Sequence, residues 1–313
     1  MTAASLPAHH LPVAVQRAAT ALVESPAPGQ TFREQVLIET NLGDAGHTLA
    51  FLQRNPALRI HAFELDPDAI ERAAQVVPPD LWKQVTVHHT SFVNLTTTLE
   101  PLGLMGHCSA VFCDPGLSLK QATVGSYGFS FTREGPLRMT FDPDATRTAA
   151  TLLAETTLTD LIATFIAQDI GERDAKTVAT AIIEQRQRQP IETTTQFRKL
   201  IEHTLKRTHE GKRHVATRYF QALRVAVNDE IHALTSVLPQ LLEALAIGGT
   251  GMLLSYQGGE AKAMRQFLTT YKRGHNGRQL ELLTPSPERS SRDEIRANPA
   301  ARSALWRLFR RVA

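Results

Sequence analysis

Short β-rich runs alternate with helical stretches up to residue 115, and this alternation constrains the fold more than any other feature of the sequence. It is the pattern of a parallel sheet wound by helices. The runs predicted to form the first four strands are residues 36–40, 60–65, 85–91 and 109–114. Short helices are expected at residues 48–53 and 68–76, and Pro67 suits the first turn of the second one. The sequence therefore predicts an α/β fold.

The alternation stops after residue 124. From there to about residue 213, apolar residues recur at helical spacing, as at Leu158, Leu161, Ile162, Phe165, Ile166 and Ile170. One long amphipathic helix is expected next, with an apolar stripe from Phe220 to Leu245. We expect a kink at Pro239 and the end of the helix at the Gly248-Gly249 pair.

Strand patterns return at residues 251–256, 280–283 and 304–309. They complete a predicted doubly wound sheet of seven strands. The expected organisation is thus one α/β domain built from residues 1–124 and 214–313, with an all-helical domain inserted at residues 125–213. A chain of 313 residues with 42% hydrophobic content is long enough to bury such a core.

Several classes of protein are excluded by composition. No segment approaches the ~20 apolar residues of a membrane helix, and residues 1–16 lack the apolar block of a secretory signal. We expect a cytoplasmic protein without membrane attachment, although the scarcity of acids in this segment leaves an organellar presequence open. Cys108 and Cys113 flank a predicted buried strand, which favours two core thiols over a disulfide or a metal site.

Charge is distributed unevenly along the chain. The net charge is only +3, but the segment from Lys262 to the end holds 12 Lys and Arg against 4 Asp and Glu. A second basic cluster contains Lys206, Arg207, Lys212, Arg213 and His214. Both features indicate a polyanionic partner, and a solvated positive surface is the alternative.

A turn of small residues, Gly43 to His47, follows the first predicted strand. Such a turn allows a ligand to approach the backbone, and it directs helix N–H groups at an anion. Glu64 ends the second strand about 20 residues later, where an acid can accept hydrogen bonds from ribose hydroxyls. The turn lacks the full G-x-G-x-x-G pattern that binds a pyrophosphate. Together these residues favour a cofactor that contains adenosine and argue against a dinucleotide.

Asp114 ends the fourth predicted strand at the edge of the sheet where open α/β folds bind ligands. A carboxylate there can orient an amino group that attacks a methyl sulfonium. The alternative is an Asp that only begins a turn before Pro115.

Several segments, in the same order over nearly the whole chain, together resemble one family, the bacterial 16S ribosomal RNA cytosine-N4 methyltransferases. They are residues 10–13, 43–47, 62–69, 127–131, 135–139, 170–173, 182–186, 216–230 and 298–304. The most specific segment is 216–230, which reads ATRYFQALRVAVNDE.

The resemblance implies a Rossmann-like, S-adenosylmethionine-dependent methyltransferase that modifies the exocyclic amine of a cytidine in small-subunit ribosomal RNA or in the assembling small subunit. The cofactor contacts that it implies are Ala45, Gly46, His47, Glu64, Phe92, Asp114 and Gln121. Asp114 is the leading catalytic candidate and Ser255 a second one. The expected RNA contacts are Lys206, Arg207, Lys212, Arg213 and Arg218. Without the resemblance, His47 would be read as a surface histidine and Phe92 as a core aromatic residue.

The chain departs from the family pattern on the substrate side. Arg138 stands where the family has an acid, and Gln257 stands where it has a histidine. These departures favour a second hypothesis, a catalytically impaired factor that binds ribosomal RNA during subunit assembly. A methyltransferase of small molecules is a third, which leaves the basic tail and the insertion unexplained. The oligomeric state stays open between a monomer and a homodimer.

Overall fold

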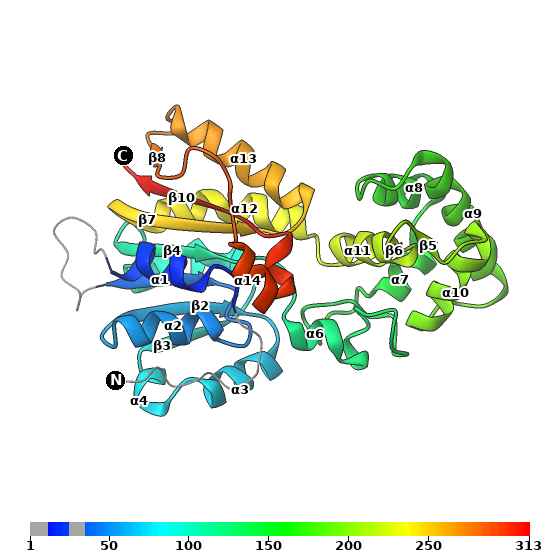
Figure 1. The fold of residues 1–313 in the computed structure, drawn as a ribbon, viewed down its shortest axis with the longest axis horizontal. Helices are drawn as coiled ribbons and strands as arrows, with labels where there is room; N and C mark the ends of the chain where they lie inside the picture. Colours follow the sequence, from blue (N-terminus) through cyan, green and yellow to red (C-terminus); the bar gives the residue numbers. More distant parts are fainter. Residues whose placement is uncertain (1–11, 25–34) are drawn as a thin grey trace. The chain divides into compact units, whose positions relative to one another are not determined.

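The computed structural model describes residues 12–24 and 35–313. The chain divides into two compact units (Figure 1). The first comprises the residues up to Gly116 and those from Ile231 onward, and the second comprises Leu117–Glu230. The second unit is therefore larger than the insertion expected at residues 125–213. The unit extends beyond residue 213 because the helix at Ala216–Val227 packs its apolar side chains into the core of the second unit.

An eight-stranded sheet forms the centre of the described part of the first unit. Its strands are β1 Val36–Thr40, β2 Arg59–Glu64, β3 Val85–His89, β4 Cys108–Cys113, β7 Leu245–Ser255, β8 Leu280–Leu282, β9 Glu288–Arg289 and β10 Leu305–Arg311. The order is β3-β2-β1-β4-β7-β10-β8, and β9 pairs with β10. The predicted α/β class is confirmed, and the seven predicted strands all form. The additional strand, β9, has only two residues, which is too short for an alternating pattern to reveal.

Strands β1, β2, β3, β4 and β7 are parallel to one another, whereas β10 is antiparallel to β7 and β8. The strand order reverses beside β1, where β2 pairs on one side and β4 on the other. Such a switch point opens a crevice at the carboxyl ends of the strands. Thr40 ends β1 and is paired with Phe63 on β2 and Cys113 on β4, so the turns after these three strands lie next to one another.

Helices cover both faces of this sheet (Figure 1). Helices α1 Val15–Val23, α2 Gly46–Arg54 and α3 Pro67–Val76 pack on one face, with α4 Pro79–Trp82 and α14 Arg292–Ala297 beside them. Helices α5 Leu95–Leu99, α12 Glu230–Ala244 and α13 Gly258–Lys272 pack on the other. The alternation along a strand explains the two cores. On β1, Leu37 belongs to the first core and Ile38 to the second.

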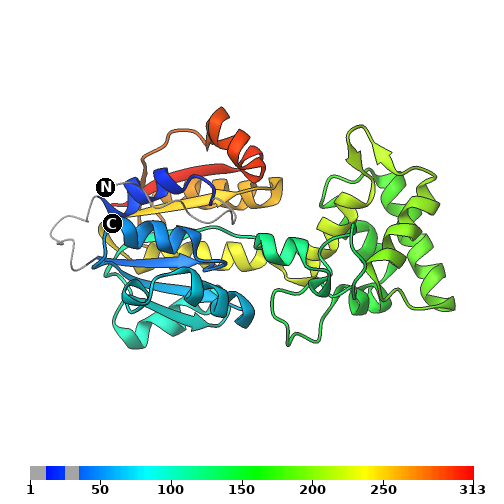
Figure 2. The same ribbon diagram turned by 60° about the horizontal axis from the view of Figure 1, so that its bottom comes forward.

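Helices make up most of the second unit (Figure 2). They are α6 Leu119–Thr123, α7 Ala149–Glu155, α8 Leu158–Ile166, α9 Glu172–Arg188, α10 Thr194–Leu205 and α11 Ala216–Val227. Helices α7 to α11 share one core that includes Phe165, Phe197 and Phe220. The prediction of a strand-free insertion is wrong at one place, where β5 His209–Glu210 and β6 Arg213–His214 form a short hairpin. Gly211, with φ of +61°, accommodates the left-handed backbone of its turn.

The long helix predicted from Phe220 to Gly249 is two helices. Helix α11 ends at Val227, and α12 begins at Glu230. The side chain of Asn228 donates to the Met139 carbonyl at 2.7 Å and accepts from the Phe141 amide at 2.9 Å, which ties the chain to a distant segment. Asp229 follows with φ of +48°, a value that a helix does not contain.

The second of these helices also ends earlier than predicted. Helix α12 contains Pro239 and stops at Ala244, and β7 begins at Leu245. Leu245 pairs with Cys108 on β4, so residues before the Gly248-Gly249 pair already belong to the sheet. Because Leu245 pairs with β4, the chain forms a strand from this residue onward, although the apolar stripe favours a continued helix.

Both cysteines are buried on β4 and are free thiols. Burial raises the pKa of Cys108 and of Cys113 to about 12, so both thiols stay protonated at neutral pH. Within residues 12–24 and 35–313, no group of three or more His, Cys, Asp or Glu side chains is arranged to hold a metal ion. None of the described helices is both long and apolar enough to cross a membrane.

Candidate active site

The turn between β1 and α2 has the backbone conformation that brings small residues to the sheet edge. Gly43 has φ of +53°, and Ala45, the residue before α2, has φ of +56°. A left-handed alanine is uncommon, and Ala45 is fully buried. A Cβ atom at Gly43 would have no other atom of the described chain within 4 Å, so the turn is open at this point.

The N-terminal segment closes the other side of the turn. A Cβ atom at Gly46 would lie 2.5 Å from Cγ of Pro12, which explains why glycine begins α2. The amide of Ala14 donates to a carboxylate oxygen of Glu294, which ties this segment to the first unit. The positions of His10 and Leu11, from the same sequence motif, fall outside the described residues.

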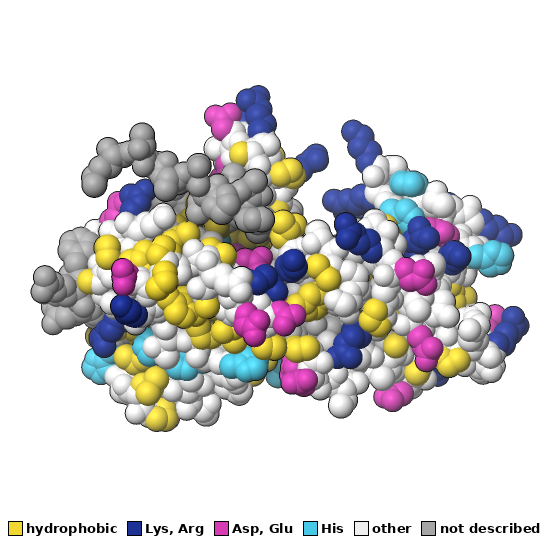
Figure 3. Space-filling view, turned by 90° about the horizontal axis from the view of Figure 1, so that it is seen from below, with side chains coloured by type: hydrophobic (Ala, Val, Ile, Leu, Met, Phe, Trp, Pro, Cys, Tyr) yellow, Lys and Arg dark blue, Asp and Glu magenta, His cyan; other side chains and the backbone are white. Residues whose placement is uncertain are grey.

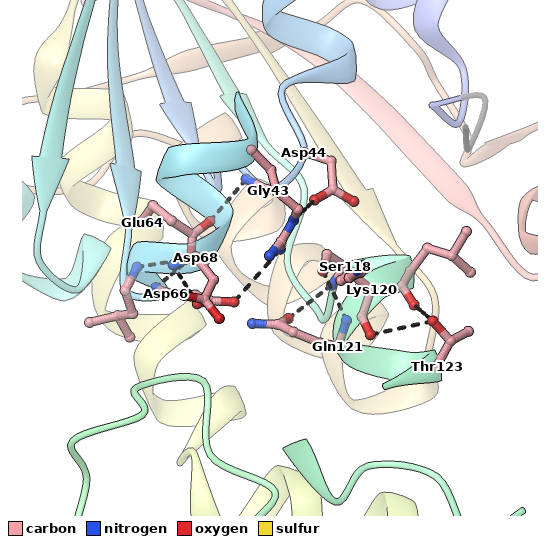
Figure 4. Close-up of polar contacts among 12 residues, drawn as sticks. Gly43, Asp44, Glu64, Asp66, Asp68, Ser118, Lys120, Gln121 and Thr123 are labelled. Carbon is pink, nitrogen blue, oxygen red and sulfur yellow. Dashed lines mark hydrogen bonds and ion pairs between the residues drawn. The ribbon is translucent and has the colours of Figure 1, made fainter. Parts of the chain in front are cut away.

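Glu64, at the end of β2, joins the turns after β1 and β2 (Figure 4). Its Oε2 accepts a hydrogen bond from the Gly43 amide at 2.9 Å, and its Oε1 accepts from the amides of Leu65 at 2.9 Å and Asp66 at 3.0 Å. Burial raises the pKa of this carboxyl, and the three backbone hydrogen bonds partly offset that effect. Since a carboxylate has about four acceptor positions, Glu64 can still accept a bond from a ribose hydroxyl.

Arg72 on α3 links the same two turns. Its Nε donates to Asp44 at 2.9 Å, and its Nη2 lies 3.8 Å from Asp66. Asp66 is buried and also caps α3 by accepting a bond from the amide of Asp68 at 3.0 Å. The side chains of Glu64 and Arg72 therefore hold the turns after β1 and β2 together.

His47 is buried, contrary to the alternative of a surface histidine. Its Nε2 lies 2.9 Å from the Val13 carbonyl, and its ring packs on Phe112 with 4.5 Å between ring centres. A carbonyl only accepts, so Nε2 carries the hydrogen and, in the neutral ring, Nδ1 carries the lone pair. Nδ1 is 3.7 Å from a carboxylate oxygen of Asp114.

Asp114 lies at the switch point of the sheet. Its amide donates to the Thr40 carbonyl at 2.7 Å, which joins the ends of β4 and β1. Its side chain is 23% exposed, so part of the carboxylate is accessible to a bound molecule. Tyr256, which follows β7, lies close enough that the charge of Asp114 adds to the effect of burial in raising the pKa of its hydroxyl. Asp114 thus has His47 and Tyr256 as neighbours, from the turns after two other strands.

Glu39 is a functional candidate that sequence reasoning missed. It lies on β1 and is 1% exposed. Thr48 donates a hydrogen bond of 2.6 Å to its Oε2, whereas its Oε1 is buried with no hydrogen-bond partner among the described residues. Burial raises the pKa of Glu39 to about 8, and the nearby charge of Asp114 adds to the increase. The available signal was an acid inside an otherwise apolar strand.

The remaining predicted residues have contacts of their own. Phe92 follows β3 and packs, partly buried, against the second core. The Ser255 hydroxyl is directed at the Leu305 carbonyl, 3.5 Å away, and so joins β7 to β10. Gln121 belongs to the second unit, where it forms a capping box with Ser118 at the start of α6 (Figure 4). The structure therefore gathers Ala45, Gly46, His47, Glu64 and Asp114 in the turns after β1, β2 and β4.

The predicted RNA contacts are all in the second unit, whose surface carries Lys, Arg and His side chains (Figure 3). Arg207 forms an ion pair with Asp174, and Arg218 donates to the Asp169 carbonyl at 2.8 Å. The three residues that are exposed and pair with no acid in the described chain are Lys206, Lys212 and Arg213. The hairpin β5–β6 and the residues just before it are therefore the strongest candidates for binding a polyanion.

Part of the basic C-terminal segment has a structural role. Arg311 donates hydrogen bonds to the carbonyls of Glu243 and Leu245, at 3.1 and 2.6 Å, where α12 meets β7. Arg278 pairs with the Glu243 carboxylate at 3.3 Å. These two arginines stabilise the end of a helix. Fewer of the basic residues in this segment are therefore available to a partner than its net charge indicates.

Comparison with known proteins gives the same family as the motif order. Residues 7–312 match the MraW methylase family. The chain belongs to this family. A similar protein is Ribosomal RNA small subunit methyltransferase H of Methylococcus capsulatus, 35% identical over 283 residues, which cover 87% of this chain and 93% of that protein. The protein of the same name from Heliobacterium modesticaldum is 31% identical over 320 residues, 97% of this chain and 99% of the other. That from Coxiella burnetii is 30% identical over 290 residues, 89% and 93% of the two chains.

MraW family methylases use S-adenosylmethionine, and the residues at the sheet edge fit that molecule. Glu64 retains an acceptor position for a ribose hydroxyl. A Cβ atom would meet nothing within 4 Å in the described chain at Gly43 or at Gly116, so the backbone is open beside β1 and β4. The buried Oε1 of Glu39, on β1, has no hydrogen-bond partner in the described chain.

Proposed function

We propose that this protein transfers a methyl group from S-adenosylmethionine to the exocyclic amine of a cytidine in small-subunit ribosomal RNA. The relatives from Methylococcus capsulatus and Coxiella burnetii are named ribosomal RNA small subunit methyltransferases. The observation that carries the proposal is Asp114, a partly exposed carboxylate at the switch point of the sheet, next to the turn that fits the cofactor.

The turns after β1 and β2 would bind the cofactor. Glu64 would accept a hydrogen bond from a ribose hydroxyl, and the open backbone at Gly43 allows close approach. We include Ala45, Gly46, His47, Phe92 and Gln121 among the proposed contacts. When bound, S-adenosylmethionine supplies an electrophilic methyl group on a positively charged sulfur.

Asp114 would prepare the acceptor amine. The lone pair of the cytosine amino group is delocalised into the ring, which makes the nitrogen a poor nucleophile. A carboxylate that accepts a hydrogen bond from this amine orients it and stabilises the positive charge that develops on nitrogen. Ser255 is only 4% exposed and its hydroxyl carries no charge, so we assign this role to Asp114.

The decisive measurement is methyl transfer by the purified protein. Small-subunit RNA and partly assembled small subunits should both be tried, because the target cytosine must leave its stack, and the product is identified by mass spectrometry. Asp114→Ala and the isosteric Asp114→Asn should abolish transfer. If the wild-type protein binds RNA but methylates neither substrate, and RNA from cells without the gene has unchanged methylcytidine, an assembly factor is the better account.

Cofactor affinity provides an independent measurement. Glu64→Ala should weaken S-adenosylmethionine binding by ~1–3 kcal/mol, the range for hydrogen bonds to a charged group. Glu71→Ala is the matched control, because Glu71 is an exposed glutamate on the neighbouring helix α3. Equal affinities of the two variants in calorimetric titration would remove Glu64 from the cofactor site.

We also propose a binding partner and a cellular compartment for this protein. The partner is ribosomal RNA or the assembling small subunit, and the proposed compartment is the cytoplasm. Light scattering of the purified protein measures whether a second copy completes a homodimer.

A further inference from the structure

We infer that Arg292 and Arg302 contact RNA phosphates next to the site of methyl transfer. Arg292 begins α14, and Arg302 ends the short 3₁₀ helix η5 Pro299–Arg302. The inference rests on the proposed function and deepens it, because it adds a phosphate-binding surface on the first unit to the β5–β6 hairpin of the second. Three features support it, which are the place of the two helices at the sheet, the contacts that hold them and the charge around Asp114.

The strand register places α14 and η5 at the edge of the sheet where Asp114 lies (Figure 1). The two helices directly precede β10, which begins at Leu305, and Leu305 pairs with Ser255 at the end of β7. β7 pairs in turn with β4, where Leu253 lies opposite Cys113, the residue before Asp114. The start of β10 is therefore two strands from the end of β4, about 10 Å.

Both helices also lie on the face of the sheet that contains the neighbour of Asp114. Ile295 of α14 and Ala301 of η5 pack in the core on the α1 and α2 side. The ring of His47 packs on Phe112 of the same core, and its Nδ1 is 3.7 Å from the Asp114 carboxylate. An RNA strand that reaches Asp114 on this face can therefore also meet α14 and η5.

Side-chain contacts hold the two helices in place. Ser291 caps α14 by accepting a hydrogen bond from the Glu294 amide at 3.1 Å, and Asn298 caps η5 by accepting from the Ala300 amide at 3.1 Å. The Glu294 carboxylate accepts from the amide of Ala14, in the segment that closes the turn before α2. The two arginines thus extend from a backbone that is ordered before RNA binds, which lowers the entropic cost of binding.

Arg292 and Arg302 are available to a phosphate. Both are exposed, and neither pairs with an acid of the described chain. Arg296, between them in sequence, pairs with Asp293 at 3.2 Å and is therefore a weaker candidate. A guanidinium group can bind one phosphate through two parallel N–H donors, which suits arginine to this role.

The charge around Asp114 explains why RNA needs cations here. The turns after β1, β2 and β4 contain no lysine or arginine. The acids in or beside these turns are Asp44, Glu64, Asp66 and Asp114, and Arg72 on α3 offsets only part of their charge. This excess of acids repels RNA phosphates. Arginines on a neighbouring surface counteract the repulsion and direct the strand to the site.

The test combines Arg292→Ala with Arg302→Ala and uses small-subunit ribosomal RNA as the probe. We expect the slope of log affinity against log salt to fall by about 1.5, from roughly 0.7–0.9 per phosphate contact. Affinity at about 0.15 M salt should fall roughly tenfold and should approach the wild-type value near 1 M. Arg292→Lys with Arg302→Lys keeps both charges and should keep the wild-type slope.

The matched control is Lys272→Ala with Arg273→Ala. It removes the same charge from exposed positions of the same basic segment. These residues precede β8, whose first residue Leu280 pairs with Arg311 at the end of β10, so they lie at the opposite edge of the sheet. A wild-type slope for the Arg292 and Arg302 alanine pair, an equal loss in this control or a reduced slope in the lysine pair would each overturn the inference.

Steady-state kinetics separate this surface from the chemical step. In the Arg292 and Arg302 alanine pair, we expect KM for RNA to rise about tenfold, while kcat and KM for S-adenosylmethionine stay within about twofold. A lower kcat with an unchanged KM for RNA would overturn the inference. If the wild-type protein binds RNA but transfers no methyl group, the proposed function fails, and the salt series still decides whether these arginines contact phosphates.

Discussion

At the residue scale, two buried glutamates at the same sheet edge are arranged differently. Glu64 receives three backbone hydrogen bonds, which suit a charged carboxylate. Glu39 receives one, from the Thr48 hydroxyl, and its other oxygen has no partner in the described chain. Burial raises the pKa of both, to about 8 for Glu39. Glu39 is therefore neutral at pH 7, and its neutrality limits the negative charge that surrounds Asp114.

The raised pKa of Glu39 predicts how stability depends on pH. The folded state binds this proton up to a pKa of about 8, while the unfolded chain releases it near 4.5, the ordinary pKa of a glutamate. The stabilisation is fully present below pH 4.5 and is lost as the pH rises to 8. Glu39→Gln, which keeps an acceptor for Thr48, should flatten the decrease in the free energy of unfolding between pH 5 and pH 8.

Tryptophan fluorescence during denaturant unfolding measures this effect, because Trp82 and Trp306 both belong to the first unit. The comparison of wild type with Glu39→Gln isolates one group, since Glu64 titrates in both proteins. Parallel pH curves for the two proteins would show that Glu39 is ionised in the folded state.

At the element scale, the β5–β6 hairpin places two exposed positive charges next to each other at its turn. Its turn contains Gly211, and Lys212 and Arg213 are exposed beside it. His214, next along the chain, is used internally, with its Nε2 3.0 Å from Glu202 and its ring stacked on Phe131. The hairpin is thus anchored at its base, and its tip is available to phosphates.

The hairpin predicts the salt dependence of RNA binding. Replacing Lys212 and Arg213 with alanine should weaken binding and should reduce the slope of log affinity against log salt by about 1.5, from roughly 0.7–0.9 per phosphate contact. The control is Arg173→Ala with Lys176→Ala, which removes the same charge from exposed positions on α9. Filter binding over a salt series gives the slopes. Equal slopes for the two double variants would exclude the hairpin as a specific phosphate contact.

At the scale of the whole molecule, each unit has apolar cores of its own. The core of the second unit draws its buried residues from positions between Leu137 and Val227. The two cores of the first unit draw theirs from the sheet and its covering helices. Arg224 and Glu230, the last residue of the second unit, pair within it at 2.7 Å.

These separate cores predict that the second unit folds alone. A fragment of residues 117–230 should give a helical circular dichroism spectrum and a cooperative thermal transition, because its apolar side chains bury one another. Replacing Phe197, which is fully buried in this core, with alanine should cost about 3–5 kcal/mol and abolish the transition. A fragment without cooperative unfolding would show that the unit depends on the rest of the chain.

Local patterns in the sequence determined the class of the fold and predicted which edge of the sheet binds a ligand. Strand runs such as Val36–Thr40 are continuous apolar stretches because both faces of a parallel strand are buried, and that pattern is visible in any one segment. Glu64 and Asp114 could be placed at the edge because parallel strands bring their carboxyl ends together.

Only the tertiary structure decided which residues from distant segments meet. Asn228 interrupts a helix whose apolar stripe is continuous, because its side chain bonds to Met139 and the amide of Phe141. The hydrogen bond of 2.9 Å from the Gly43 amide to Glu64 likewise joins residues that follow or end different strands. Periodicity reports how a segment buries its own side chains, whereas hydrogen bonds between distant segments depend on positions that only the packed core fixes.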